Sequence, residues 1–112
     1  MAMTPEAKVK KVVAHYLKTL GAYYFYPATG GFGRSGVPDI VACYKGVFFG
    51  IECKAGKGKT TALQQKNLAD IHAAGGCDWV VNETNMHDTA TVLEFESRVE
   101  RQRVRASIHK QK

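Results

Sequence analysis

A pair of carboxylates followed by a lysine is the feature of this sequence with the clearest chemical use. Twelve residues separate Asp39 from Glu52, and Lys54 follows Glu52 by two positions. Two neighbouring carboxylates repel each other, so they need a compensating cation, either the lysine or a bound metal ion. Oxygen ligands without a His or Cys cluster favour Mg²⁺ or Mn²⁺. Such an ion polarises a phosphoryl oxygen and activates a water, while an adjacent lysine can stabilise charge developing on a phosphate.

The segments that carry these residues are predicted to pair as a β-hairpin. Residues 38–44 and 47–54 are both apolar and β-rich, and only Lys45-Gly46 separates them. Antiparallel pairing then brings Asp39 and Glu52 to the same end of the sheet. Nearly continuous apolar character is typical of central strands, where terminal charges are costly unless they have a function. The alternative is that the first carboxylate only begins a strand and the second forms an exposed ion pair with the lysine.

Helix signals lie on both sides of this hairpin. One helix is expected over residues 5–20, capped by Thr4, and a second after residue 61, where Thr61 and Gln64 form a capping box. A third is expected over 88–99 with three residues facing inward, namely Val92, Phe95 and Val99. Short strands are expected over residues 22–27 and 77–81. The resulting order, α-β-β-β-α-β-α, predicts an α/β fold with a central mixed sheet flanked by helices.

The motifs taken together resemble the PD-(D/E)xK nucleases. The resemblance rests on Gly36-Val37-Pro38-Asp39 and Ile51-Glu52-Cys53-Lys54, with Glu6 in the first helix and Thr61-x-x-Gln64 opening the second. Within that superfamily the sequence is most similar to the stand-alone, phage and bacterial type of virus-type replication-repair nuclease (VRR-NUC) domain, over most of residues 4–81. This resemblance implies a restriction-endonuclease-like α-β-β-β-α-β core. Length, composition and charge predict residues 1–100 as a single domain, here a nuclease domain, and residues 101–112 as a basic C-terminal tail.

The same resemblance implies roles for individual residues. Asp39, Glu52 and the backbone carbonyl of Cys53 would bind Mg²⁺ or Mn²⁺, and Lys54 would be the catalytic lysine. Family members of this short type are implied to act as homodimers on branched DNA.

Two further residues have a structural alternative beside the role that the resemblance implies. Glu6 would complete the acidic cluster, but it also suits the first turn of a helix, where a carboxylate faces the positive helix end. Gln64 would assist Lys54 or the substrate phosphate, but it is also the capping-box residue of the second helix.

Basic residues are candidates for contacts with the DNA backbone. The chain has a net charge of +6, and residues 98–112 hold six basic side chains against one acidic one. Such an end suggests a polyanionic partner, or else a solvated terminus. The glycine-rich segment 28–37 is either a substrate loop or a plain connection, and residues 57–59 form either a DNA clamp or a solvated turn. The candidate DNA-binding residues are Arg34, Lys57, Lys59, Arg101, Arg103 and Arg105.

The sequence therefore predicts a Mg²⁺-dependent DNA endonuclease that is selective for branched structures such as four-way junctions. The alternatives are a nucleic-acid-binding module with the same fold and no turnover, and a flap or restriction-like nuclease. A homodimer is expected, with the third helix, including Leu93, and strand residues 23–26 as candidate interface surfaces.

Cellular location is predicted from what the sequence lacks. No signal peptide or membrane span is recognisable, so we expect no membrane association and a cytoplasmic protein. Its three cysteines, Cys43, Cys53 and Cys77, are expected as reduced, buried thiols.

Overall fold

The fold is known from a computed structural model, which describes residues 3–28 and 35–110, with side chains as far as residue 99. Its elements follow the predicted order, with one additional short 3₁₀ turn before the last helix. They are α1 (Pro5–Leu20), β1 (Tyr23–Phe25), β2 (Ile40–Tyr44), β3 (Val47–Cys53), α2 (Ala62–Ala73), β4 (Cys77–Val81), η1 (Met86–Asp88) and α3 (Thr89–Lys110). Among the described residues, no helix is long and apolar enough to span a membrane.

Local signals set the ends of α1 and α2. The Thr4 hydroxyl accepts a hydrogen bond from the backbone N–H of Ala7, and Gly21 ends α1 in the left-handed conformation with φ 77°. The capping box predicted at the start of α2 is complete, because Thr61 and Gln64 each accept a backbone hydrogen bond from the other. Both helices therefore begin where the sequence predicts.

The sheet is mixed, and its strand order is β1-β2-β3-β4. The first three strands pair antiparallel, whereas β4 runs parallel to β3. Lys45 and Gly46 turn the predicted hairpin with φ values of 50° and 82°, as expected for a two-residue turn that needs positive φ at both positions. β1 is shorter than the predicted strand because only three of its residues pair with β2.

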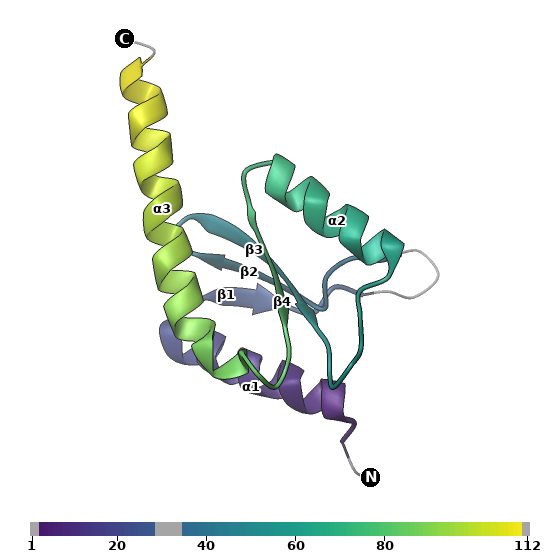
Figure 1. Cartoon of the computed structure of the whole chain (residues 1–112). Coiled ribbons are helices and arrows are strands. Elements are labelled where there is room, and N and C mark those ends of the chain that lie inside the picture. Colours follow the sequence, from purple (N-terminus) through teal and green to yellow (C-terminus); the bar gives the residue numbers. More distant parts are fainter. Residues whose placement is uncertain (1–2, 29–34, 111–112) are drawn as a thin grey trace.

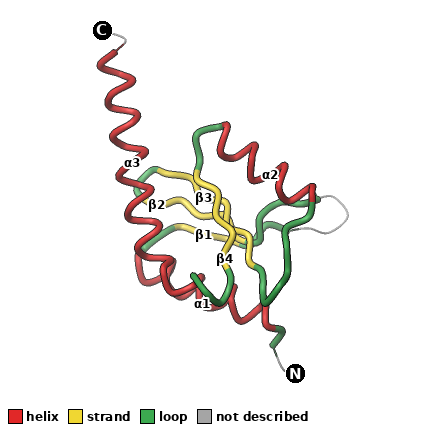
Figure 2. The backbone as a smooth tube through the Cα atoms, viewed as in Figure 1, coloured by secondary structure: helices red, strands yellow, loops and turns green. Residues whose placement is uncertain are grey.

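Helices cover the two faces of the sheet unequally (Figures 1 and 2). α1 and α3 pack on one face and enclose the main core, while α2 lies on the opposite face over β3 and β4. The close fit of α2 is visible at Gly50, where an added Cβ would lie 2.4 Å from Ile71 Cδ1. The core side chains are Val9, Val13, Leu17, Ile40, Ala42, Tyr44, Val47, Phe49, Ile51, Cys53, Cys77, Val81 and Leu93.

The predicted orientation of the third helix is wrong. Leu93 and Ser97 are fully buried, whereas Phe95 is 59% exposed. The buried hydroxyl of Ser97 donates to the backbone carbonyl of Glu94, so a polar residue occupies the inward stripe at low cost. Leu93 therefore cannot form part of a dimer surface.

Two smaller expectations also change. The third helix, which was expected to end at residue 99, continues to Lys110, so α3 extends beyond the sheet (Figure 1). Cys43 is exposed rather than buried, because it lies on the sheet face that carries α2, where that helix does not reach β2.

Candidate active site

The predicted carboxylates meet at one end of the sheet. The β2–β3 register pairs Ile40 with Ile51, so its continuation places Asp39 opposite Glu52. The first turn of α1 reaches the same end (Figure 1), and it brings Glu6 to the pair. Carboxylate oxygens of Glu6, Asp39 and Glu52 all lie within 4.8 Å of one another.

The surroundings of Glu52 disfavour a negative charge on its carboxylate. Its side chain is 1% exposed, and its Oε2 atom is buried with no hydrogen-bond donor. Burial raises the pKa of Glu52 to about 8, and the neighbouring carboxylate of Asp39 adds to the rise. The cost of ionising Glu52 is therefore high unless a cation or a proton compensates it.

Lys54 and Gln64 supply the partners of the other Glu52 oxygen. Lys54 Nζ lies 4.0 Å from Glu52 Oε1, and the lysine side chain is only 12% exposed. Gln64 Nε2 donates to the same oxygen at 3.1 Å. The strand alternation accounts for this arrangement, because Glu52 and Lys54 both point toward the face that carries α2. Sequence reasoning left open whether Gln64 caps the helix or serves the site, and the structure shows contacts of both kinds.

Asp39 is held from two directions. Its Oδ2 atom accepts a hydrogen bond of 2.8 Å from the backbone N–H of Cys53. The segment that leads into it is fixed to α2, because Asn67 Nδ2 donates to the carbonyl of Ser35 at 3.3 Å. Gly36 then passes so close to α2, with φ 77°, that an added Cβ would lie 2.6 Å from Leu63 Cγ. Only glycine suits this position, because the backbone φ is positive and there is no space for a side chain.

A hollow of about 480 Å³ opens beside the acidic cluster. Glu6, Asp39 and Lys10 are among the residues that line it. Lys10 was not identified from the sequence, although its spacing from Glu6, one helical turn, puts the two on the same face of α1. Its ammonium lies 4.3 Å from the centre of the Tyr26 ring. Burial raises the pKa of the nearby Cys53 thiol to about 12, and the charge of Lys10 acts in the opposite direction.

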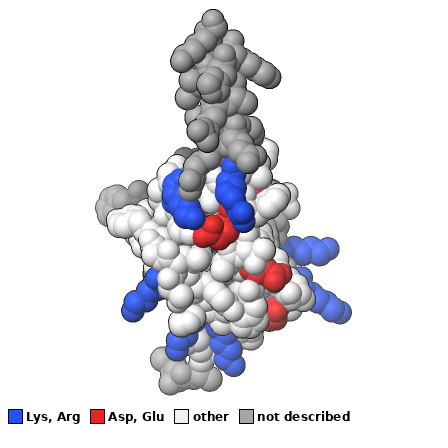
Figure 3. Space-filling view, turned by 90° about the vertical axis from the view of Figure 1, so that its left-hand side faces the viewer, with Lys and Arg blue, Asp and Glu red and all other residues white. Residues whose placement is uncertain are grey.

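The candidate DNA-binding residues lie outside this cluster. Lys57 and Lys59 are exposed in the turn after β3, which is fixed to the end of β4 because Glu83 accepts hydrogen bonds from the Gly56 N–H. Arg34 lies outside the described residues. The remaining three, Arg101, Arg103 and Arg105, belong to α3, and their side chains lie outside the described part. On the face seen in Figure 3, lysine and arginine side chains are dispersed rather than gathered into one patch.

The donor set suits a hard divalent cation. Three carboxylates converge, one of them with a buried oxygen that receives no hydrogen bond. All-oxygen sites of this kind favour Mg²⁺, Mn²⁺ or Ca²⁺ over zinc. A cation there would also remove the cost of keeping Glu52 ionised.

Solved structures of similar fold were found by comparison. Among solved structures, a "VRR_NUC domain" is similar with a TM-score of 0.65 and 22% identity, and the match covers 82% of this chain and 97% of that one. A "VRR_NUC domain protein" is similar with a TM-score of 0.60 and 17% identity, over 86% and 90% of the two chains. These likenesses show the fold that was expected. No curated protein matched the sequence significantly.

A family model places the chain by its sequence. The model described as archaeal Holliday junction resolvase (Hjc) matches residues 8–111. The matched range contains Asp39, Glu52 and Lys54, and only Glu6 of the acidic cluster lies before it. The chain therefore belongs to the archaeal Holliday junction resolvase family, whose members are nucleases of the PD-(D/E)xK type.

Proposed function

We propose that this protein is a metal-dependent DNA endonuclease that hydrolyses phosphodiester bonds in branched DNA such as four-way junctions. The proposal rests on the burial and the neighbours of the Glu52 carboxylate. Its carboxylate is buried beside Asp39 and Glu6, it keeps one oxygen without a donor, and it lies 4.0 Å from the ammonium of Lys54. A purely structural carboxylate would be expected to have its buried oxygens satisfied.

Each residue of the cluster has a role in this proposal. Asp39, Glu52 and the carbonyl of Cys53 hold Mg²⁺ or Mn²⁺, and Glu6 completes the acidic cluster. The ion supplies Lewis-acid polarisation of the phosphoryl oxygen and a lower pKa for the attacking water.

Two neighbouring side chains act beside these ligands. Lys54 stabilises the charge that develops on the phosphate, because its ammonium is largely removed from solvent. Gln64 keeps Glu52 oriented through its hydrogen bond to Oε1.

The proposed substrate follows from the family. The family model that matches is one of four-way-junction resolvases. Family membership therefore favours a nuclease selective for branched DNA over a sequence-specific restriction enzyme. A non-enzymatic DNA-binding module is disfavoured because Asp39, Glu52 and Lys54 are all retained and converge.

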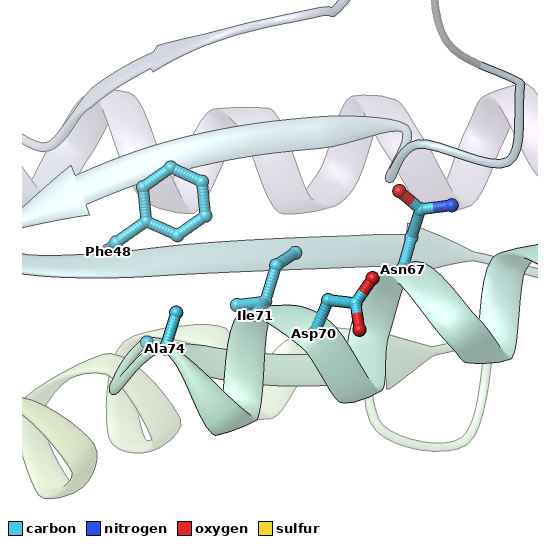
Figure 4. A pocket seen from close by; sticks show the side chains of 6 residues that line it. Phe48, Asn67, Asp70, Ile71 and Ala74 are labelled. Atoms are coloured by element: carbon cyan, nitrogen blue, oxygen red, sulfur yellow. The ribbon is translucent and has the colours of Figure 1, made fainter.

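We further propose that the active form is a homodimer. One site cuts one strand, whereas resolving a four-way junction takes two symmetry-related cuts, which a two-fold dimer supplies. Of the two candidate surfaces, β1 presents the exposed apolar rings that a dimer interface needs, because Tyr23 is 72% exposed and Phe25 48% exposed. Both lie on the sheet face that α2 leaves open over β1 and β2. That face continues into an apolar groove where Phe48 of β3 lies opposite Ile71 and Ala74 of α2 (Figure 4).

Cleavage of defined DNA structures tests the proposal. Labelled duplex, flap and four-way-junction DNA would each be incubated with the protein in Mg²⁺ or in chelator, and the cuts mapped. We expect paired cuts in the junction that require the metal and that are lost in Asp39→Asn, whose fold should persist because the amide oxygen can still accept from Cys53. Cleavage by Asp39→Asn at the wild-type rate would refute the site, and preferential cutting of flaps would change the substrate.

A further inference from the structure

The hollow beside the acidic cluster contains a lysine whose charge is not neutralised by any carboxylate that the structure describes. Lys10 lines this hollow together with Glu6 and Asp39. Nevertheless, among the described residues no carboxylate oxygen lies within 4.0 Å of its ammonium. A flexible surface lysine with acidic neighbours commonly pairs with one of them or extends into solvent. Lys10 does neither, because its ammonium lies over the face of Tyr26, 4.3 Å from the ring centre.

The ring contact fixes the ammonium without using its donors. A cation over an aromatic face is held by the quadrupole of the ring, and the contact is oriented but needs no hydrogen-bond acceptor. The three N–H groups of the ammonium are therefore available to an acceptor that enters the hollow. The orientation of the Tyr26 ring is supported by Tyr24, because the two rings pack edge to face with 6.2 Å between their centres.

The acidic cluster creates a need for such a cation. A DNA phosphate that approaches three carboxylates is repelled by them, and Lys54 compensates only near Glu52. Lys54 belongs to the sheet face that carries α2, whereas Lys10 projects from α1 on the other side of the cluster. The two ammonium groups thus flank the carboxylates from opposite elements of the fold.

We infer that Lys10 binds a phosphate oxygen of the DNA next to the cleavage site, and that Tyr26 is a positioning residue that holds the Lys10 ammonium in place. This inference rests on the proposed DNA-cleaving function. Because the contact exists before the reaction, it contributes to substrate binding and to KM more than to kcat.

Binding measured without turnover tests the role of Lys10. A labelled four-way junction would be titrated in chelator, at several salt concentrations, with Lys10→Ala and with Lys11→Ala. Lys11 is a matched control, because it is an exposed lysine of the same helix that lines a different depression. We expect Lys10→Ala to raise Kd about tenfold and to lower the slope of log K against log salt by about 0.9, the value for one neutralised phosphate, with Lys11→Ala unchanged. Single-turnover cleavage in Mg²⁺ at saturating DNA should fall much less than tenfold.

Variants of Tyr26 separate positioning from simple packing. Tyr26→Phe keeps the ring and should bind DNA as the wild-type protein does, whereas Tyr26→Leu should weaken binding. On the Lys10→Ala background, Tyr26→Leu should have no further effect, because the ring then has no cation to hold. Additive losses would overturn the positioning role.

The two proposals fail in distinguishable ways. Equal behaviour of Lys10→Ala and Lys11→Ala in a protein that cleaves junctions would overturn this inference alone. A wild-type protein that binds DNA through Lys10 but cleaves none with any divalent metal would overturn the nuclease proposal and leave the binding contact.

Discussion

Gln64 connects the start of α2 to the buried carboxylate of Glu52. Its Oε1 atom accepts from the backbone N–H of Thr61 at 2.9 Å, and its Nε2 atom donates to Glu52 Oε1 at 3.1 Å. One amide thus completes a capping box and satisfies one oxygen of the acidic cluster. Glu52 is thereby oriented by a helix that is itself fixed tightly against β3 at Gly50.

Substitutions at Gln64 should separate these two hydrogen bonds. Gln64→Glu keeps an acceptor for Thr61 but removes the donor to Glu52, so we expect the helix cap to persist and cleavage to fall. Gln64→Ala removes both, and it should lower the free energy of unfolding by about 1 kcal/mol per hydrogen bond. Chemical denaturation and single-turnover cleavage measure the two effects. Full activity of Gln64→Glu would mean that the hydrogen bond to Glu52 has no catalytic importance.

Glu52 should make the stability of the metal-free protein depend on pH. In the folded chain the pKa of Glu52 is raised to about 8 from an ordinary value of 4.5, chiefly by burial. Between these values the folded chain holds a proton that the unfolded chain has released. Stability is therefore fully present below about pH 4.5 and decreases as the pH rises through 8, by at most about 1.4 kcal/mol per pH unit.

Denaturation in chelator from pH 5 to 9 would measure this dependence, with Glu52→Gln as the control. The variant has no proton to lose at this position, so its stability should vary less with pH. Added Mg²⁺ should also reduce the decrease in the wild-type protein, because a cation favours the ionised form. Parallel profiles for both proteins would show that Glu52 ionises normally.

Lys54→Ala should reduce turnover far more than DNA affinity. The Lys54 ammonium is largely removed from solvent beside Glu52, so in the proposed mechanism it acts on the charge that develops on the phosphate in the transition state more than on the bound substrate. We expect a loss of roughly 10²- to 10³-fold in the single-turnover rate, as is typical when a group that stabilises the transition state is removed. Lys54→Arg keeps the charge but not its compact shape, and it should recover only part of the rate. Equal losses in rate and in affinity would instead make Lys54 a phosphate-binding residue.

The elements around the site could be predicted because their signals are local. Thr4 and Gly21 mark the ends of α1, and Thr61 and Gln64 mark the start of α2. Lys45-Gly46 forms the turn of the hairpin. In each case a few adjacent residues provide the cap or the positive φ that the backbone needs there. The convergence of Asp39 and Glu52 follows from that hairpin alone.

Other features depend on contacts between distant segments. The prediction for the inward face of α3 is wrong because hydrophobicity favours Phe95, whereas the structure buries Leu93 in the main core and Ser97 one turn further along the helix. Lys10 could not be distinguished by type from its neighbours Lys8 and Lys11, because its importance comes from Tyr26, which the fold brings to it.

The basic end of the chain should supply attraction to DNA that is sensitive to salt and insensitive to sequence. Residues 98–112 carry six basic side chains and one acidic one. Deleting residues 101–112 should weaken junction binding and reduce the slope of log K against log salt by about 0.9 for each phosphate that is no longer neutralised, with catalysis retained at saturating DNA. Replacing Arg101, Arg103 and Arg105 by Gln keeps the length of α3 and serves as the matched variant. An unchanged slope in both variants would show that this segment does not contribute to DNA binding.

The open aromatic face of the sheet should form the dimer interface. Phe25→Ser removes an exposed ring from that face, and Phe95→Ser removes a ring that is even more exposed from the outer side of α3. Because a small domain needs a largely apolar surface to hold two sites in fixed relation, Phe25→Ser should convert a dimer to a monomer by light scattering at micromolar concentration. Phe95→Ser should not change the assembly.

Cleavage of a plasmid that extrudes a cruciform tests the same interface through activity. The wild-type dimer should produce linear DNA by paired cuts, whereas the Phe25→Ser monomer should only nick. Dissociation by Phe95→Ser alone would move the interface to α3, and a wild-type monomer that still linearises the plasmid would remove the need for a dimer.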